Sequence, residues 1–327
     1  MILSIVGRVD ARRLTYPLAA LLALTACGDG GESPGAANAR VVATTTQVAD
    51  LARNVAGDRA AVTGLLSTGS DPHDYEPRPS DVRAVVDADL VLKSGGDLDG
   101  WADQIVDSAD GERRVVELAD DVQTTRVPDG VVDPHWWQDP LNAGRAVRRI
   151  RSALVEADPG GRASYSRNAR RYLAALQRLD EQIGACLRRI PPARRKLVTT
   201  HDALGYYAAR YGLEVVGAAI PALTTEAQPS AGETARLVRQ VREQRVRAIF
   251  PETGLDRRLE EAIADEAGVS VGGGLWADTL GASGSSGATY LEAMRHNTSV
   301  IAEALTGGER SCRWAASGRR RGSPRGG

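Results

Sequence analysis

The strongest constraint on the fold is an alternation of short runs of β-branched residues with longer amphipathic segments, which occurs twice along the chain. In the first series the predicted strands are 40–45, 60–66, 89–93 and 114–118, and the predicted helices are 47–55, 80–86 and 98–108. In the second series the predicted strands are 196–200, 215–218, 248–251 and 269–271, and the predicted helices are 204–211, 231–244, 257–267 and 290–305. Strands that alternate with helices at this spacing predict βα units and parallel sheets.

A purely helical stretch separates the two series. It contains a predicted helix at 141–156 and a longer one at 162–189. The apolar residues of the longer helix recur at steps of three and four and form one buried stripe, namely Tyr172, Leu176, Leu179 and Ile183. With 327 residues the chain can bury one large core or two modest ones. We therefore predict an α/β protein with two lobes, each a mainly parallel sheet flanked by helices, joined by a long rigid helix. The predicted boundaries are 40–160 for the amino-terminal lobe, 161–190 for the linking helix and 191–308 for the carboxy-terminal lobe.

The amino terminus has the order of an export signal. Three arginines (Arg8, Arg12 and Arg13) precede an apolar run at 14–23, which is followed by Leu-Thr-Ala and then Cys27. This order predicts a signal peptide over 1–26, since the run is about half of the roughly 20 residues that cross a bilayer. Leu-Thr-Ala-Cys resembles the bacterial lipobox, which implies lipidation of Cys27; an ordinary secretory leader with an incidental cysteine is the alternative. The Gly-, Ser- and Ala-rich segment 27–39 then serves as a flexible tether. The expected location is extracytoplasmic, with a lipid anchor in the cell membrane.

The charge distribution separates the body of the chain from its ends. The formal net charge is −1, of which the leader contributes +2 and the segment 309–327 contributes +5, so the body carries about −8. An acidic body argues against nucleic-acid binding and favours the approach of cations. We expect the basic segment 309–327 to be disordered and assign it no function.

Two cysteines remain once Cys27 is set aside. Cys186 and Cys312 form an even pair in a compartment where disulfides can form. Their spacing alone leaves two interpretations open, a disulfide between them or two separate thiols.

Three of the four histidines have similar surroundings. His73 and His135 both lie in an Asp-Pro-His sequence, and His201 lies in Thr-Thr-His-Asp. Each follows a predicted strand or lies in a proline-bounded loop, and ligands of open α/β sheets bind at the carboxyl ends of strands. The spacings of 62 and 66 residues exclude a zinc finger or a His-Glu-x-x-His helix, so only the fold could assemble a shared site. Singly, each histidine fits an ordinary surface or core role; jointly, the three indicate a metal site. His296, inside the last predicted helix, is expected to be structural.

Four segments of the chain resemble the metal-binding receptors of the zinc and manganese ABC importers. They are Asp71–Pro77, Asp133–Pro140, His201–Tyr207 and Leu275–Gly281, and the resemblance runs in the family's order from about Val41 to Leu305. It implies a metal site with His73 and His135 from the first lobe and His201 and Asp278 from the second. Glu252 matches a recurrent acidic position and is implied to lie beside these ligands. The resemblance further implies a monomeric receptor, not an enzyme, that moves little on binding and delivers its ion to the membrane permease of an ABC importer.

The expected cargo is Zn²⁺, with Mn²⁺ as the alternative. Three imidazoles and one carboxylate suit Zn²⁺, whereas Mn²⁺ prefers more oxygen ligands. Manganese-type relatives usually have a carboxylate in place of the third imidazole, so His201 is the discriminating position. The sequence departs from the family at Trp136 and Gln138, where smaller or more apolar residues are usual, and it lacks the long His-rich loop of many zinc-specific members.

Two other classes of function fit the sequence less well. A zinc-dependent hydrolase needs an open coordination position, which a fourth ligand such as Asp278 would close, and the chain has no Gly-x-Ser-x-Gly, phosphate-loop or His-Glu-x-x-His motif. A receptor for an organic solute, such as a chelated metal, would need an aromatic-lined cleft. One Phe, eight Tyr and five Trp argue only weakly against such a cleft.

Overall fold

The computed structural model describes residues 39–109, 113–125 and 130–314. The predicted signal peptide, Cys27, the tether up to residue 38 and the end of the basic segment from residue 315 lie outside this part of the chain. Within the described part, no helix is both long enough and apolar enough to cross a membrane.

The first lobe contains one four-stranded parallel sheet, as predicted. Its strands are β1 (Ala39–Ala43), β2 (Ala60–Gly64), β3 (Leu90–Lys93) and β4 (Arg114–Glu117), in the spatial order β2-β1-β3-β4. Its helices are α1 (Thr46–Ala56), α2 (Pro79–Val86) and α3 (Trp101–Ser108). Successive residues of β1 alternate between two cores: Val41 packs in the core that contains α1, and Val42 packs with α2 and α3. Burial of both faces explains why these strands read as continuous apolar runs.

The second lobe repeats the pattern with shorter strands. Its elements are β5 (Lys196–Thr199), α6 (Gly205–Tyr211), β6 (Glu214–Ala218), α7 (Ala231–Glu243), β7 (Ala248–Ile249), α8 (Arg258–Ala267) and β8 (Ser270–Val271). Parallel ladders join β5 to β6 and β7 to β8, and a single bridge from Thr199 to Phe250 connects them. The strand predicted at 248–251 ends early because Pro251 has no N–H for a ladder. The strand predicted at 269–271 is followed by three glycines, which are unfavourable in strands.

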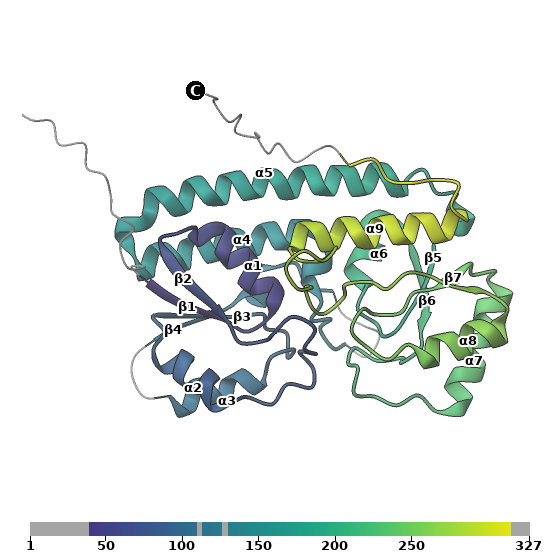
Figure 1. Ribbon diagram of the computed structural model, residues 1–327, viewed down its shortest axis with the longest axis horizontal. Coiled ribbons are helices and arrows are strands. Elements are labelled where there is room, and N and C mark those ends of the chain that lie inside the picture. The colour runs from purple at the N-terminus through teal and green to yellow at the C-terminus, as the bar shows by residue number, and fades with distance from the viewer. Residues whose placement is uncertain (1–38, 110–112, 126–129, 315–327) are drawn as a thin grey trace, which may run out of the picture. The chain divides into compact units, whose positions relative to one another are not determined.

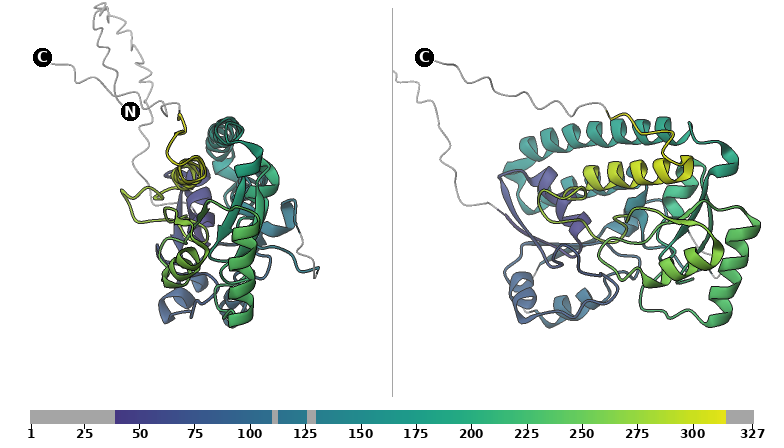
Figure 2. Two further views of the ribbon diagram at one scale, coloured as in Figure 1. Left: turned by 90° about the vertical axis from the view of Figure 1, so that its right-hand side faces the viewer. Right: turned by 45° about the vertical axis from the view of Figure 1, so that its right-hand side comes forward.

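A layer of long helices spans both lobes (Figures 1 and 2). It consists of α4 (Pro140–Ala157), α5 (Arg162–Leu187) and α9 (Tyr290–Thr306). The predicted stripe of α5 is buried against its neighbours, with Leu179 and Ile183 fully enclosed. The predicted fold class is thus confirmed: two α/β lobes with parallel sheets are joined by a long helix.

Candidate metal centre

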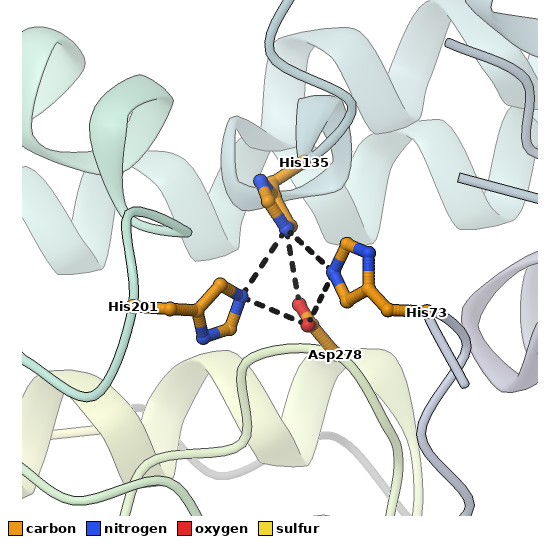
Figure 3. A group of neighbouring side chains, drawn as sticks. All are labelled: His73, His135, His201 and Asp278. Carbon is orange, nitrogen blue, oxygen red and sulfur yellow. Dashed lines mark hydrogen bonds and ion pairs between the residues drawn. The ribbon is translucent and has the colours of Figure 1, made fainter. Parts of the chain in front are cut away.

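Four side chains from distant parts of the chain meet at one point between the two lobes (Figure 3). They are the four predicted ligands, His73, His135, His201 and Asp278, and one ligand atom from each lies within 4.8 Å of the others. Asp278 Oδ2 is 3.1 Å from His73 Nε2 and 3.0 Å from His201 Nε2. The Nε2 atom of His135 lies 3.4 Å from the Nε2 atoms of both other histidines. All three imidazoles therefore present the same ring nitrogen to one shared space.

The two Asp-Pro-His sequences form the same local turn. Asp71 Oδ1 accepts the backbone N–H of His73 (2.9 Å), and Asp133 Oδ1 accepts the backbone N–H of His135 (3.0 Å). A side-chain oxygen that caps the N–H two residues on is an Asx turn, which the intervening proline favours. Each turn carries a histidine whose imidazole reaches the shared point between the lobes.

The histidines differ in what holds the far side of the ring. His135 Nδ1 lies 2.7 Å from Asp133 Oδ1, and His201 Nδ1 lies 3.2 Å from Glu252 Oε2. Such carboxylates fix the tautomer, so that Nε2 is left to bind a cation. For His201 this carboxylate is Glu252 and not Asp202, the next residue in the chain. Glu252 Oε1 also accepts the backbone N–H of Asp278 (3.0 Å).

Residues from both lobes hold the loop that carries Asp278. The carbonyl oxygen of Ala277 accepts hydrogen bonds from Trp137 Nε1 (2.9 Å) and Gln138 Nε2 (3.0 Å). Gln138, a departure from the family pattern, therefore ties the first lobe to the Asp278 loop. Trp136 is fully buried and donates to the carbonyl of Ser94 (3.2 Å), so this second departure is part of the first lobe's core.

The second lobe in turn braces the turn of His135. Tyr206 Oη donates to the carbonyl of Asp133 (2.8 Å). Gly205 leaves room for that carboxylate, because a Cβ at position 205 would lie 2.8 Å from Asp133 Oδ2. The Leu-Gly-Tyr sequence after His201 therefore shapes the surroundings of a different histidine.

The centre is buried and electrostatically coupled. His135, His201 and Asp278 are 0%, 1% and 2% exposed. Burial would raise the pKa of Asp278, but His201 and His135 lower that pKa well below its usual value. Burial would lower the pKa of His201, but Asp278 and Glu252 raise it well above its usual value. Burial, together with repulsion from Asp278, raises the pKa of Glu252. His201 and Asp278 thus stabilise each other's charged forms.

The donor set fits a divalent transition-metal ion. Asp278 Oδ1 is buried without a hydrogen-bond partner among the described residues, and it lies 3.5 Å from His135 Nε2. A buried carboxylate oxygen without a hydrogen bond is costly unless a cation or proton compensates it. Three imidazole nitrogens and a carboxylate are ligands that zinc and related ions accept.

The space around the centre suits an ion better than an organic molecule. The two cavities that directly adjoin His201 and Asp278 have volumes of about 10 Å³ each. A larger cavity of about 250 Å³ lies further out, lined by five carboxylates and no lysine or arginine: Asp71, Asp74, Glu226, Asp256 and Glu260. At its edge, Thr225 Oγ1 donates to Asp71 Oδ2 (2.5 Å) across the two lobes. This outer cavity, lined by chain neighbours of His73 and His201, places negative charge near the centre.

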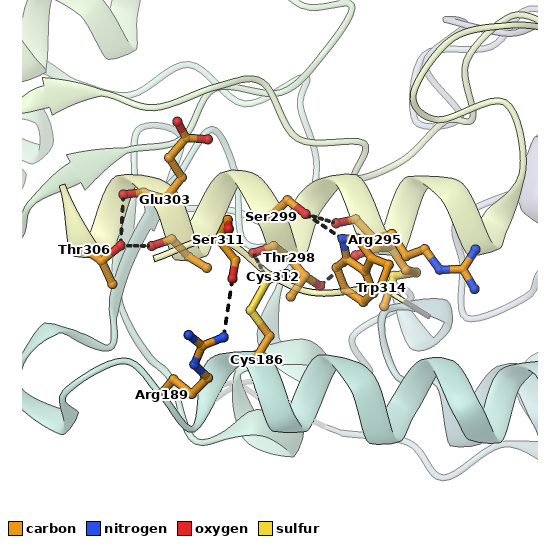
Figure 4. Close-up of a disulfide and its surroundings, with 12 residues drawn as sticks. Cys186, Arg189, Arg295, Thr298, Ser299, Glu303, Thr306, Ser311, Cys312 and Trp314 are labelled. Atoms are coloured by element: carbon orange, nitrogen blue, oxygen red, sulfur yellow. Dashed lines mark hydrogen bonds between the residues drawn. A yellow bond between two sulfur atoms is a disulfide. The ribbon is translucent and has the colours of Figure 1, made fainter. Parts of the chain in front are cut away.

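The remaining predicted residues are also placed by the structure. Cys186, at the end of α5, forms a disulfide with Cys312, with a Cα–Cα distance of 5.3 Å (Figure 4). Nearby, Trp314 Nε1 donates to Ser299 Oγ of α9 (3.0 Å). His296 Nε2 lies 3.1 Å from the carbonyl of Gly274, away from the four ligands.

Sequence reasoning missed the residues that hold the centre in place. Gln138, Tyr206 and Thr225 act through contacts between segments more than 70 residues apart. The unusual polarity of Gln138 next to a candidate ligand was a usable signal. No local pattern distinguishes Thr225 from other loop threonines.

Comparisons with known proteins agree with this geometry. The chain matches the family described as zinc-uptake complex component A periplasmic (ZnuA) over residues 41–304. It is 33% identical to the manganese-binding lipoprotein MntA of Halalkalibacterium halodurans, over 88% of this chain and 96% of the relative. It is 30% identical to the iron-binding protein YfeA of Yersinia pestis, over 86% of this chain and 91% of the relative. The structure of the periplasmic zinc-binding protein TroA from Treponema pallidum matches with a TM-score of 0.76 at 29% identity, over 81% of this chain and 98% of that one. The chain therefore belongs to the ZnuA family, the extracytoplasmic metal-binding receptors of ABC importers, which are solute-binding proteins and not enzymes.

Proposed function

We propose that this receptor is lipidated at Cys27, binds one Zn²⁺ through His73, His135, His201 and Asp278, and delivers it to its permease. The observation that carries the proposal is the convergence of three Nε2 atoms and one buried carboxylate within 4.8 Å. Two ligands come from each lobe, so the bound ion would hold the lobes together.

The choice of zinc rests on the donor set. The names of the relatives carry manganese, iron and zinc, so family membership leaves the metal open. Three neutral imidazoles and one carboxylate make a borderline-soft ligand set, which favours Zn²⁺ over Mn²⁺. The Irving–Williams order likewise gives Zn²⁺ a higher affinity than Mn²⁺ for such a site.

Manganese is the second candidate because of the orientation of Asp278. Oδ2 of this carboxylate faces His73 and His201, and Oδ1 faces His135. Both oxygens are thus available to one ion, and two oxygen ligands would suit Mn²⁺ better than one.

Binding exchanges protons for the ion. Burial lowers the pKa of His201, but Asp278 and Glu252 raise it above its usual value, so a cation at this imidazole competes with a proton. A cation must displace that proton, because only a neutral imidazole donates an electron pair. Release to the permease would require the lobes to separate and the contact between Thr225 and Asp71 to break.

The test is a metal titration of residues 28–327, purified free of metal. Zn²⁺ and Mn²⁺ are titrated against a competing chelator. We expect one tight zinc equivalent, weaker manganese binding, loss of tight zinc binding in His201→Ala and weaker binding in Asp278→Ala. His296→Ala is the matched control and should bind like the parent chain. Tight zinc binding in both ligand variants would contradict the assignment of the site. Tighter binding of Mn²⁺ than of Zn²⁺ would make Mn²⁺ the cargo in place of Zn²⁺.

A further inference from the structure

Positive charge is concentrated in one part of the molecule. The segment 140–195, which contains α4 and α5, has 13 arginines and only four carboxylates, a net charge of +9. The body of the chain as a whole carries about −8, so the two lobes outside this segment carry about −17. The metal site explains a negative surface near the ion, but it does not explain this basic helical layer.

The arginines of α5 form one exposed face. Those of the helix and its carboxyl end are all exposed: Arg162, Arg167, Arg170, Arg171, Arg178, Arg188 and Arg189. At 100° per residue, most of them lie opposite the buried stripe that contains Leu176 and Leu179. Within the described residues none of the seven forms an ion pair with a carboxylate, whereas Arg210 is bound to Asp180 through two hydrogen bonds. We call these seven residues the arginine face.

The shape and composition of the arginine face fit a flat anionic surface. A helix of 26 residues is about 39 Å long, and the arginines recur along its whole length. None of the exposed large hydrophobic residues of the described chain lies on α5. Without aromatic or apolar anchors, this face lacks what a base-stacking surface or the core of a protein interface needs.

The first described residue of the chain, Ala39, lies in the part of the fold beside one end of this face. Ala39, the first residue of β1, pairs with Ala60 of β2. The adjacent Arg59 binds Asp158 at 2.6 Å, four residues before Arg162. Eleven residues separate Cys27 from Ala39, so the covalent chain between them spans at most about 40 Å. An anchor at Cys27 would therefore keep the start of α5 close to the membrane, at a high effective concentration.

We propose that the arginine face binds the anionic phospholipid headgroups of the membrane. The lipidated receptor then rests with α5 against the bilayer, an orientation that rests on the proposed anchor at Cys27. The outer acidic cavity is lined by loops that lead into α2, α7 and α8. These helices lie at the edge of the molecule opposite α5 (Figures 1 and 2). The bound orientation thus exposes the approach to the metal centre and keeps the acidic lobes away from the anionic surface.

The test measures vesicle binding without the lipid anchor. The mature chain with Cys27→Ser is sedimented with vesicles of phosphatidylglycerol and phosphatidylcholine, or of phosphatidylcholine alone. We expect binding only to the anionic vesicles, strong at about 20 mM salt and weak at about 500 mM. Each arginine near such a surface contributes about fivefold in affinity, so Arg170→Glu, Arg171→Glu and Arg178→Glu together should weaken binding by at least about 100-fold.

The matched control changes the same charge elsewhere. Arg236→Glu, Arg239→Glu and Arg242→Glu on α7 alter the net charge equally and should weaken binding far less. Equal losses in both triple variants, or a loss caused only by removal of 315–327, would overturn the proposal. So would retention on a heparin column without vesicle binding. A zinc titration and a thermal melt of each variant show that the metal site and the fold are intact, so this outcome is independent of the proposed metal binding.

Discussion

The turns at Asp71 and Asp133 share the sequence Asp-Pro-His, yet they hold their histidines differently. Asp133 binds both the backbone N–H and the ring of His135, which is completely buried. Asp71 binds only the backbone N–H of His73, and its second oxygen accepts the hydroxyl of Thr225 from the other lobe. The side chain of His73 remains 8% exposed. The comparison indicates that the ring of the proposed ligand His135 is preformed, because its own turn orients it, whereas the turn of His73 does not orient its ring.

The largest effect should come from removal of the preformed ligand. His135→Ala should weaken zinc binding by well over the 10–100-fold that loss of a supporting group typically costs. His73→Ala should weaken binding less, because His201, Asp278 and His135 would still bind the ion and water could replace the lost imidazole at the more exposed position. Competitive titration with a chelator measures both. Equal losses would show that the two turns contribute alike to the site.

The two aspartates provide a sharper test, because asparagine preserves the turn. Asp133→Asn keeps an acceptor for the backbone N–H but removes the charge that orients the ring of His135, so zinc affinity should fall by about 10–100-fold. Asp71→Asn should have a smaller effect, since Asp71 makes no bond to the ring of His73. Asp202→Asn is the control, because this aspartate follows a ligand but does not bind its ring. A loss in Asp71→Asn as large as in Asp133→Asn would contradict the comparison.

The two turns also show how much of the site could be predicted from the sequence. The period of the apolar residues predicted α5 and most strands, and failed at 248–251, where Pro251 prevents a longer ladder. The Asp-Pro-His turns marked two histidines through local chemistry. Asp278 could be chosen only through the family resemblance, because its role depends on the bridge of Glu252 to Leu275 and on bonds from the other lobe. Such contacts between distant segments leave no local pattern.

An acid-stability test distinguishes effects on the stability of the whole fold from effects on the two turns at the metal centre. Asp158 lies far from the metal centre, and the hydrogen bond from its main partner, Arg59, lowers its pKa. A depressed pKa stabilises the fold at neutral pH, and this contribution is lost as the pH falls through the folded-state pKa. Asp158→Asn should therefore lower the free energy of unfolding at pH 7 by about 1.5–3 kcal/mol, as for a charged hydrogen bond, and by less in acid. Urea denaturation measures this difference.

The same variant should leave zinc affinity at neutral pH unchanged. If zinc binding and stability fell together in Asp158→Asn, the affinity losses in the turn variants would have to be separated from partial unfolding before the two turns are compared.

The smallest effect is expected for the contact between the lobes. Thr225→Val removes the hydroxyl that Asp71 accepts but keeps the size of the side chain. A hydrogen bond of this kind contributes about 1 kcal/mol, or about fivefold in a rate, and this contact joins the two lobes. Zinc dissociation should therefore accelerate about fivefold, with little change in the association rate, in stopped-flow measurements with a chelator. Thr224→Val is the neighbouring control, because Thr224 bonds only within its own loop. An unchanged dissociation rate in Thr225→Val would mean that closure does not depend on the turn of His73, and that burial of the ligands alone retains the ion.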